Sequence, residues 1–309
     1  MDTFIQQIIN GLVTGSMYAL IALGYTMVYG VLNLINFAHG EVLMVGAMVG
    51  LMILKLLHVY VPGLPGIVQL FIAIAGSIPI CIAVNVLIER VAYRRLRNAP
   101  RLAPLITAIG VSILLQTFAM KIWGRSPLPF PQILSAEPIH LGGVLISQTQ
   151  ILLLVLALAA MLGLVFLVEK TKMGRAMRAT AENPRVAGLM GVDSNKVIVL
   201  TFAIGAALAS VAGVMWGANY SQVQFGMGFL PGLKAFSAAV LGGIGNIYGA
   251  MVGGILLGLI ESLGAGYIGD LTGGFLGSHY QDIFAFVVLI IVLTIRPSGI
   301  MGERVADRA

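Results

Sequence analysis

Residues 148–168 read QTQILLLVLALAAMLGLVFLV, a run of 21 residues without a charged side chain. An α-helix rises about 1.5 Å per residue, so about 20 apolar residues span the ~30 Å hydrocarbon core of a bilayer. Similar runs recur along the chain, at about 8–31, 41–57, 67–88, 102–122, 197–219, 232–268 and 282–296. They are too long for barrel strands and lack strand-like alternation, so we predict that all are helices.

The composition predicts the same class of protein. The chain has 309 residues, of which 59% are hydrophobic and only 10% are charged. Its mean hydropathy is +0.99. Since no linker or low-complexity segment divides the sequence, we expect an all-α polytopic membrane protein with a single transmembrane domain over residues 1–309.

The positions of the basic residues predict the orientation in the membrane. Of the 18 lysines and arginines, 14 lie in three short segments. The members are Arg90, Arg94, Arg95, Arg97 and Arg101; Lys170, Lys172, Arg175, Arg178, Arg185 and Lys196; and Arg296, Arg304 and Arg308. Because cytoplasmic loops carry an excess of Lys and Arg, all three segments are expected in the cytoplasm and the amino terminus outside. The net charge of +6 is then an orientation signal and does not indicate nucleic-acid binding.

The apolar stretch 232–268 is too long for one plain helix. Gly242, Gly243 and Gly245 predict a break into a short crossing and a return helix, with a re-entrant loop as the alternative layout. The total is then eight or nine membrane segments. Pairs of glycines four residues apart predict close helix packing, at Gly11/Gly15, Gly249/Gly253 and Gly254/Gly258.

The sequence contains no motif for ATP hydrolysis or metal chemistry. It has no GxxxxGK[ST] and no HExxH, and no nucleophile–base motif is evident. The four histidines are scattered, at positions His39, His58, His140 and His279, and the single cysteine, Cys81, lies in an apolar run. We therefore expect a protein that is not an enzyme and holds no cofactor of its own.

The longest polar segment, about 170–196, contains RAMRATAENPRVAGLMGV at 175–192. Asn183 predicts a helix N-cap, Pro184 fits the first helical position, and Gly191 fits the position after the helix end. Val186, Leu189 and Met190 would share one face of this short helix. Two interpretations remain open: a rigid knob that docks on another protein, or an amphipathic helix that lies on lipid headgroups.

Polar and ionisable residues inside apolar runs are functional candidates, because a charge in the bilayer is costly. They are Asn36, His39, Glu41, Lys234, Asn246 and Glu261. Two roles remain open for them: lining a translocation path, where Glu41 and Lys234 would suit a zwitterionic solute, or fixing helix ends and helix contacts. Asn246 is also expected to cap the return helix beyond the glycine break.

Several long motifs together resemble one known family. They are NGLVTGSMYALIALGYTMVYGVLNLINFAHGE (10–41), IERVAYRRLR (88–97), RAMRATAENPRVAGLMGV (175–192), TFAIGAALASVAGVM (201–215), LKAFSAAVLGGIGNIYGAMVGGILLG (233–258) and RPSGIMG (296–302). Over essentially the full chain, they resemble the LivH-type permeases of branched-chain amino acid ABC importers. The resemblance implies the bundle of a type II ABC importer permease in the bacterial inner membrane.

The resemblance also implies partners and a coupling role. Expected partners are a second, related permease, two cytoplasmic ATPases that hold ATP and Mg, a periplasmic binding protein and membrane lipid. The segment 175–192 would be the coupling helix, and the residues that seat in an ATPase cleft would be Arg175, Arg178, Glu182, Asn183, Pro184 and Arg185. The implied cargo is leucine, isoleucine and valine.

Other functions remain as alternatives. Related permeases serve urea, short amides or other amino acids. An ion-coupled secondary transporter would use Glu41 or Glu261, although paired buried carboxylates are not evident in the sequence. A membrane-embedded enzyme is disfavoured because no catalytic motif is present.

Overall fold

The computed structural model describes residues 2–97, 99–100, 102–134, 138–141, 143–271, 273 and 281–302. Arg101, His279, Arg304 and Arg308 lie outside the described residues. The helices are α1 (Asp2–Leu32), α2 (His39–Tyr60), α3 (Gly66–Ile88), α4 (Leu102–Trp123), α5 (Gln148–Lys170), α6 (Lys172–Glu182), α7 (Pro184–Leu189), α8 (Ser194–Tyr220), α9 (Phe229–Gly242), α10 (Ile247–Leu271) and α11 (Gln281–Ile295). A π-helical turn, Glu89–Tyr93, and a 3₁₀ turn, Arg94–Leu96, extend α3.

The short strands form two small antiparallel pairs. They are β1 (Leu128–Pro129), β2 (Ile139–Leu141), β3 (Val144–Ile146) and β4 (Gln222–Val223), with β1 paired to β4 and β2 paired to β3. The longer elements are all helices. Within the described residues, seven helices are long and apolar enough to cross a membrane. Two further apolar helices are shorter, at Phe229–Gly242 and Phe286–Ile295. The all-α polytopic class predicted from the sequence is confirmed.

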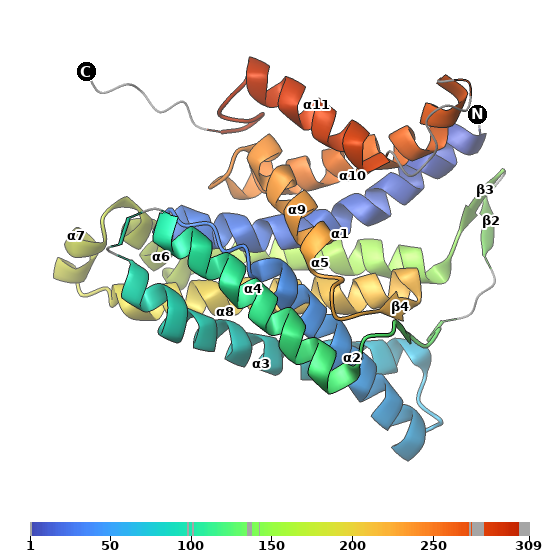
Figure 1. Cartoon of the computed structure of the whole chain (residues 1–309), viewed down its shortest axis with the longest axis horizontal. Coiled ribbons are helices and arrows are strands. Elements are labelled where there is room, and N and C mark those ends of the chain that lie inside the picture. The colour runs from blue at the N-terminus through green and yellow to red at the C-terminus, as the bar shows by residue number, and fades with distance from the viewer. Residues whose placement is uncertain are drawn as a thin grey trace.

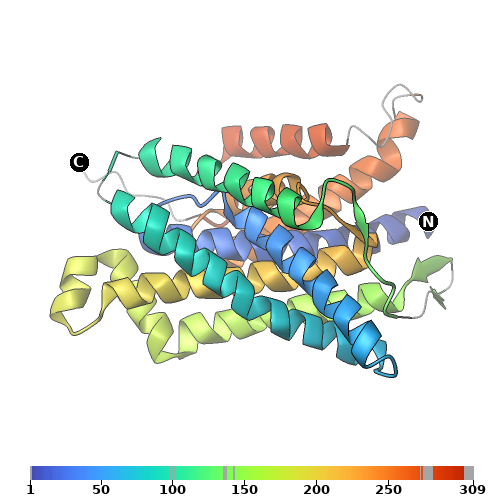
Figure 2. The same ribbon diagram turned by 60° about the horizontal axis from the view of Figure 1, so that its bottom comes forward.

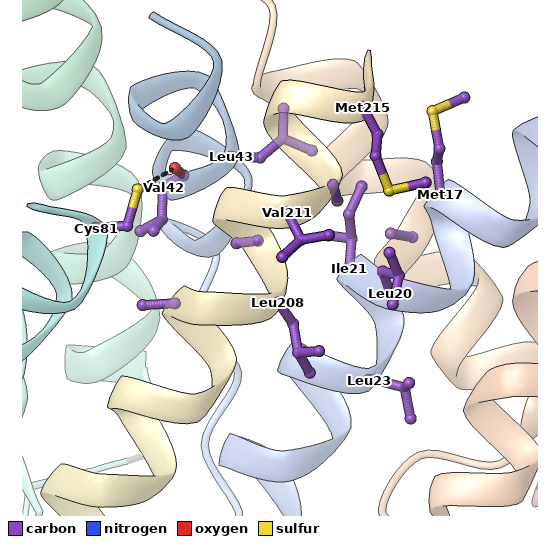
Figure 3. Packing of buried hydrophobic residues seen from close by; sticks show 14 of the residues in the cluster. Met17, Leu20, Ile21, Leu23, Val42, Leu43, Cys81, Leu208, Val211 and Met215 are labelled. Carbon is purple, nitrogen blue, oxygen red and sulfur yellow. Dashed lines mark hydrogen bonds between the residues drawn. The ribbon is translucent and has the colours of Figure 1, made fainter. Parts of the chain in front are cut away.

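Three helices form the centre of the bundle and three lie at its periphery. The most apolar windows of α1, α2 and α8 are 72%, 61% and 78% buried, whereas those of the helices that begin at Gly66, Leu102 and Gln148 are only 22–28% buried. Figure 3 shows the central contacts, where α1, α2 and α8 meet through side chains such as Ile21, Leu43 and Val211. The predicted core position of Cys81 is confirmed: its thiol is buried and donates to the carbonyl of Val42 at 3.6 Å (Figure 3).

The backbones of α1 and α10 approach each other closely at their glycines. A Cβ at Gly11 would lie 2.8 Å from Leu259 Cα, and a Cβ at Gly258 would lie 2.3 Å from Gly15 Cα. Further along, a Cβ at Gly254 would lie 2.4 Å from Ala19 Cα. Residue numbers rise on one helix as they fall on the other, so the two helices are antiparallel, and the predicted role of the glycine pairs in packing is confirmed.

The predicted glycine break lies between α9 and α10. Gly243 and Gly245 have φ angles of +108° and +97°, values that residues other than glycine rarely adopt. Helix α9 has only 14 residues, about 21 Å, and is too short to cross the hydrocarbon core by itself. Its carbonyls at Leu241 and Gly242 accept hydrogen bonds from the backbone of Ile300 and Met301, so the chain beyond α11 closes the end of α9.

The two ends of the bundle differ in structure. Helices α6 and α7 lie at one end, and the β2–β3 hairpin lies at the opposite end with the start of α1, in both orientations (Figures 1 and 2). Gln6 ties α1 to the hairpin, because its amide donates to the Leu145 carbonyl at 3.0 Å and accepts from the Leu145 N–H at 2.9 Å. The arrangement separates a polar, helical end from a hairpin end.

Candidate functional site

The polar end is built from two capped helices. The hydroxyl of Thr171 accepts a hydrogen bond from the Gly174 N–H and begins α6. The side chain of Asn183 accepts from the N–H groups of Arg185 and Val186 and begins α7, with Pro184 at the first helical position. Gly191, with φ +84°, follows the end of α7. The predicted N-cap, proline and terminal glycine are thus confirmed as local structure.

Helix α7 presents apolar side chains to its surroundings. Val186, Leu189 and Met190 are 53%, 87% and 80% exposed, while Ala187 alone of the α7 residues is buried. Such exposure in so short a helix is typical of a surface that another molecule covers. We call these three exposed residues the apolar tip.

The charged residues of this segment divide into two groups. Arg175, Glu182 and Arg185 are exposed beside the apolar tip. Arg178, also on the exposed side, donates from its guanidinium to the carbonyl of Val168 near the end of α5. Arg178 therefore fixes α6 against α5, a contact that sequence spacing did not reveal.

The link from α7 to α8 is also fixed by side chains. The carboxylate of Asp193 accepts from the N–H groups of Asn195 and Lys196 and caps α8, and the hydrogen bond from Lys196 is the main reason that the pKa of Asp193 lies below its usual value. The hydroxyl of Ser194 donates to the carbonyl of Pro184 at 3.1 Å. The Ser194 hydrogen bond therefore ties the start of α8 to the start of α7.

The polar residues at the start of α2 lie inside the bundle. The amide oxygen of Asn36 accepts from the N–H of Ala38 at 3.1 Å and from the hydroxyl of Tyr93 at 2.8 Å. The His39 ring is fully buried; it packs against the ring of Tyr25, with 5.0 Å between the ring centroids, and a Cβ at Gly24 would lie 2.1 Å from its Nε2.

Glu41, in the first turn of α2, connects that helix to the peripheral helix α4. Its carboxylate oxygen Oε1 accepts from the Ser112 hydroxyl at 3.0 Å and from the Gln116 amide at 2.7 Å. The side chains of Ser112 and Gln116 are four residues apart on one face of α4. Sequence reasoning missed both, although their i, i+4 spacing in an apolar helix was a visible signal.

Lys234 belongs to a separate group of charges. Its ammonium lies 2.8 Å from Glu261 Oε1 on α10 and 2.7 Å from Asp282 Oδ1 on α11, and the other oxygen of Glu261 accepts from the hydroxyl of Tyr18 on α1 at 2.9 Å. The two ion pairs join α9 to α10 and α11, and the hydrogen bond from Tyr18 joins α10 to α1. Lys234 and Glu41 thus have different partners, and the sequence analysis did not identify Asp282.

Asn246 lies in the break between α9 and α10. Its amide oxygen accepts from the Gly249 N–H at 3.0 Å, which confirms the predicted cap, and its amide nitrogen donates to the Met301 carbonyl at 2.9 Å. The side chain therefore holds both the start of α10 and the chain beyond α11.

A cavity of about 220 Å³ lies away from these residues, between the start of α5 and the end of α8. Its wall includes Ser147, Gln150 and Ser221. In the described part of the chain, no three His, Cys, Asp or Glu side chains are grouped so that they could hold a metal ion.

Comparison with known proteins gives consistent matches over the whole length. The family described as "Branched-chain amino acid transport system / permease component" matches residues 7–293. The chain is 47% identical to the high-affinity branched-chain amino acid transport system permease protein BraD of Pseudomonas aeruginosa, over 97% of this chain and 96% of that protein. It is 44% identical to LivH of Escherichia coli, a permease protein of a system with the same description, over the same shares of the two chains.

More distant matches have other names or cover less of the chain. A probable branched-chain amino acid transport permease protein LivH of Methanocaldococcus jannaschii is 32% identical over 95% of this chain and 91% of that protein. The ribose import permease protein RbsC of Escherichia coli is 30% identical over 43% of each chain. No solved structure matches.

Proposed function

The chain belongs to the family of permease components of branched-chain amino acid transport systems and is a multi-pass protein of the bacterial inner membrane, and we propose that it forms part of the transmembrane path of an ATP-driven importer of leucine, isoleucine and valine. Permeases of this class work with ATPase and binding-protein partners. The observation that carries the proposal is the apolar tip, which is exposed on a rigid, doubly capped element.

The apolar tip provides a binding surface for a separate ATPase. The sequence has no nucleotide-binding motif, so the energy of ATP must reach it through contact with another protein. Exposed Leu189 and Met190 would fill an apolar cleft, while Arg175, Glu182 and Arg185 at the rim would set its orientation. Arg178, Asn183 and Pro184 would act within the same element by fixing its shape.

We assign the route of the solute to the region around the break between α9 and α10 and the start of α2. Helix breaks in the interior are common places for solutes to pass in transporters. Asn36, His39 and Glu41 lie at the start of α2, and Lys234 and Asn246 lie in and after α9. Glu41, Lys234 and Asn246 are bonded to other side chains or to backbone, and the His39 ring packs against Tyr25. These residues would therefore border the route and hold the helix ends in place, while the binding protein supplies most of the selection.

The proposed assembly follows from the family and from the positions of the basic residues. The α6–α7 end faces the cytoplasm, where its basic residues favour it, and the amino terminus faces outside. A second, related permease completes the path, two cytoplasmic ATPases hold ATP and Mg, and a periplasmic binding protein delivers the amino acid to the hairpin end. This chain holds no cofactor and binds membrane lipid but no nucleic acid.

A charge reversal tests the coupling surface. Glu182→Lys adds two positive charges at the rim of the apolar tip, and we expect it to abolish association with the ATPases while the permease still inserts in the membrane. The measurement is a pull-down of ATPase subunits on the solubilised permease. The matched control is Arg125→Glu, an exposed charge reversal of the same size beyond the end of α4, which should leave association intact. Normal association of Glu182→Lys would remove the coupling assignment.

Reconstituted uptake tests the cargo. The assembled transporter in liposomes should import leucine, isoleucine and valine only with ATP and a matching binding protein, and a panel of binding proteins would identify the cargo. Uptake that continues without ATP and stops when the ion gradient is dissipated would contradict the proposal in favour of a secondary transporter.

A further inference from the structure

A chain of hydrogen bonds leads from the α7–α8 link into the bundle. Arg97, just beyond the 3₁₀ turn, donates to the side-chain oxygen of Asn195 at 2.6 Å, and a second nitrogen of its guanidinium pairs with the carboxylate of Glu89. Asn195 is the second residue of α8, and the Asp193 carboxylate binds its N–H. Arg97 is therefore bound directly to the segment that follows the coupling element.

The next step runs through the π-helical turn. Glu89 and Tyr93 are its first and last residues, and both are buried. The hydroxyl of Tyr93 donates to Asn36, whose amide oxygen also accepts the N–H of Ala38. The chain of contacts thus ends at the start of α2, immediately before His39 and Glu41. Single turns of π-helix occur frequently at functional sites.

Helix α3 does not need Arg97 to stay attached to α8. The amide of Asn85 donates to the carbonyl of Phe202 at 2.7 Å, and the rings of Tyr93 and Phe202 lie with centroids 5.6 Å apart. A buried ion pair is in general weak evidence for stability, because desolvation offsets its attraction. The Arg97–Glu89 pair, with side chains 19% and 0% exposed, calls for another role.

Unpaired atoms along this chain of contacts point to a second arrangement. Among the described residues, Glu89 Oε2, Arg97 Nε and Asn36 Nδ2 are buried without a hydrogen-bond partner. A buried polar atom without a hydrogen bond is destabilising, because it has lost its contact with water. Partners for these atoms would become available if Arg97, the π-helical turn and the α1–α2 connection shifted relative to one another.

We propose that Arg97 is a positioning residue of the transport cycle, which passes the displacement of the α6–α7 element through Glu89 and Tyr93 to the start of α2. The inference rests on the proposed function, since it needs an ATPase that moves α7. Arg97 contacts no solute; it acts by coupling the position of the α6–α7 element to the position of the start of α2.

The test measures how many leucine molecules enter per ATP hydrolysed, in the complete transporter reconstituted with a loaded binding protein. Arg97→Gln should keep ATP hydrolysis near the wild-type rate and lower leucine import per ATP by about 3- to 30-fold. Arg97→Lys, which keeps the charge, should restore part of the loss. The matched control is Arg95→Gln, an exposed arginine of the adjacent 3₁₀ turn, which should leave the ratio unchanged.

A second variant keeps the proposal testable if Arg97→Gln fails to fold. Asn195 is exposed, so Asn195→Ala removes a single contact at little risk to folding, and it should lower the same ratio. The double variant Arg97→Gln/Asn195→Ala should lose no more than Arg97→Gln alone. A wild-type ratio in both single variants would overturn the proposal. Absence of ATP-driven uptake in the wild-type complex would instead overturn the proposed function.

Discussion

Two glycine-rich regions of this molecule differ in what surrounds their glycines. Between α1 and α10, a Cβ at Gly258 would lie 2.3 Å from backbone, whereas nothing lies within 4 Å of a Cβ at Gly188 or Gly191 in and after α7. At the α1–α10 contact the space beside the glycines is filled by the neighbouring helix, whereas the apolar side chains of the α7 region are exposed. Substitutions in the first region should therefore destabilise the fold, whereas substitutions of the exposed apolar side chains in the second should mainly affect what binds there.

The largest effect is expected at the charges that join α9, α10 and α11, of which Lys234 and Glu261 are buried and Asp282 is partly exposed. Lys234→Met leaves two carboxylates, Glu261 and Asp282, without their cation and should lower the free energy of unfolding by about 3–5 kcal/mol. Thermal unfolding of the purified permease in detergent measures it. Lys55→Met, at an exposed lysine of α2, is the control. An unchanged unfolding temperature for Lys234→Met would show that these ion pairs contribute nothing.

A smaller loss is expected at the α1–α10 contact. Gly258→Val places side-chain carbons against the backbone of Gly15 and should cost about 1–3 kcal/mol, or prevent the two helices from meeting. The same unfolding assay measures it. Gly163→Val on α5 is the matched control, because nothing lies within 4 Å of a Cβ there. Equal losses in both variants would mean that helix propensity, and not close packing, is responsible.

The smallest effect on stability is expected at the apolar tip. Leu189→Ser removes a side chain that is 87% exposed, so the isolated permease should unfold within about 0.5 kcal/mol of the wild type. The same variant should reduce recovery of ATPase subunits in a pull-down. If Leu189→Ser destabilised the permease as strongly as Gly258→Val does, Leu189 would have to pack within the chain and would not be part of a surface that binds a partner.

Much of the fold could be predicted from the sequence, because its decisive features are local. Apolar runs long enough for a bilayer located the spanning helices, although α1 begins at Asp2, about six residues before the predicted run at 8–31. Asn183, Pro184 and Gly191 marked a short helix whose caps lie close in sequence, and Gly243 and Gly245 marked the helix break.

The partners of the interior polar residues could not be predicted in the same way. Glu261 and Asp282 meet Lys234 across three helices, and Ser112 meets Glu41 from a helix 71 positions away. Helical periodicity fixes which face a residue occupies but not which other helix that face meets. That Glu41 and Lys234 border a path for a zwitterion stays a prediction, and the partners that each has within the chain are known only from the structure.

The antiparallel contact of α1 with α10 has a mechanical consequence. At Gly11, Gly15, Gly254 and Gly258 the two backbones lie so close that a side chain would not fit between them. The hydrogen bonds of Tyr18 with Glu261 and of Ser262 with Gln7 hold the same pair of helices together. This combination favours displacement of α1 and α10 as a single unit.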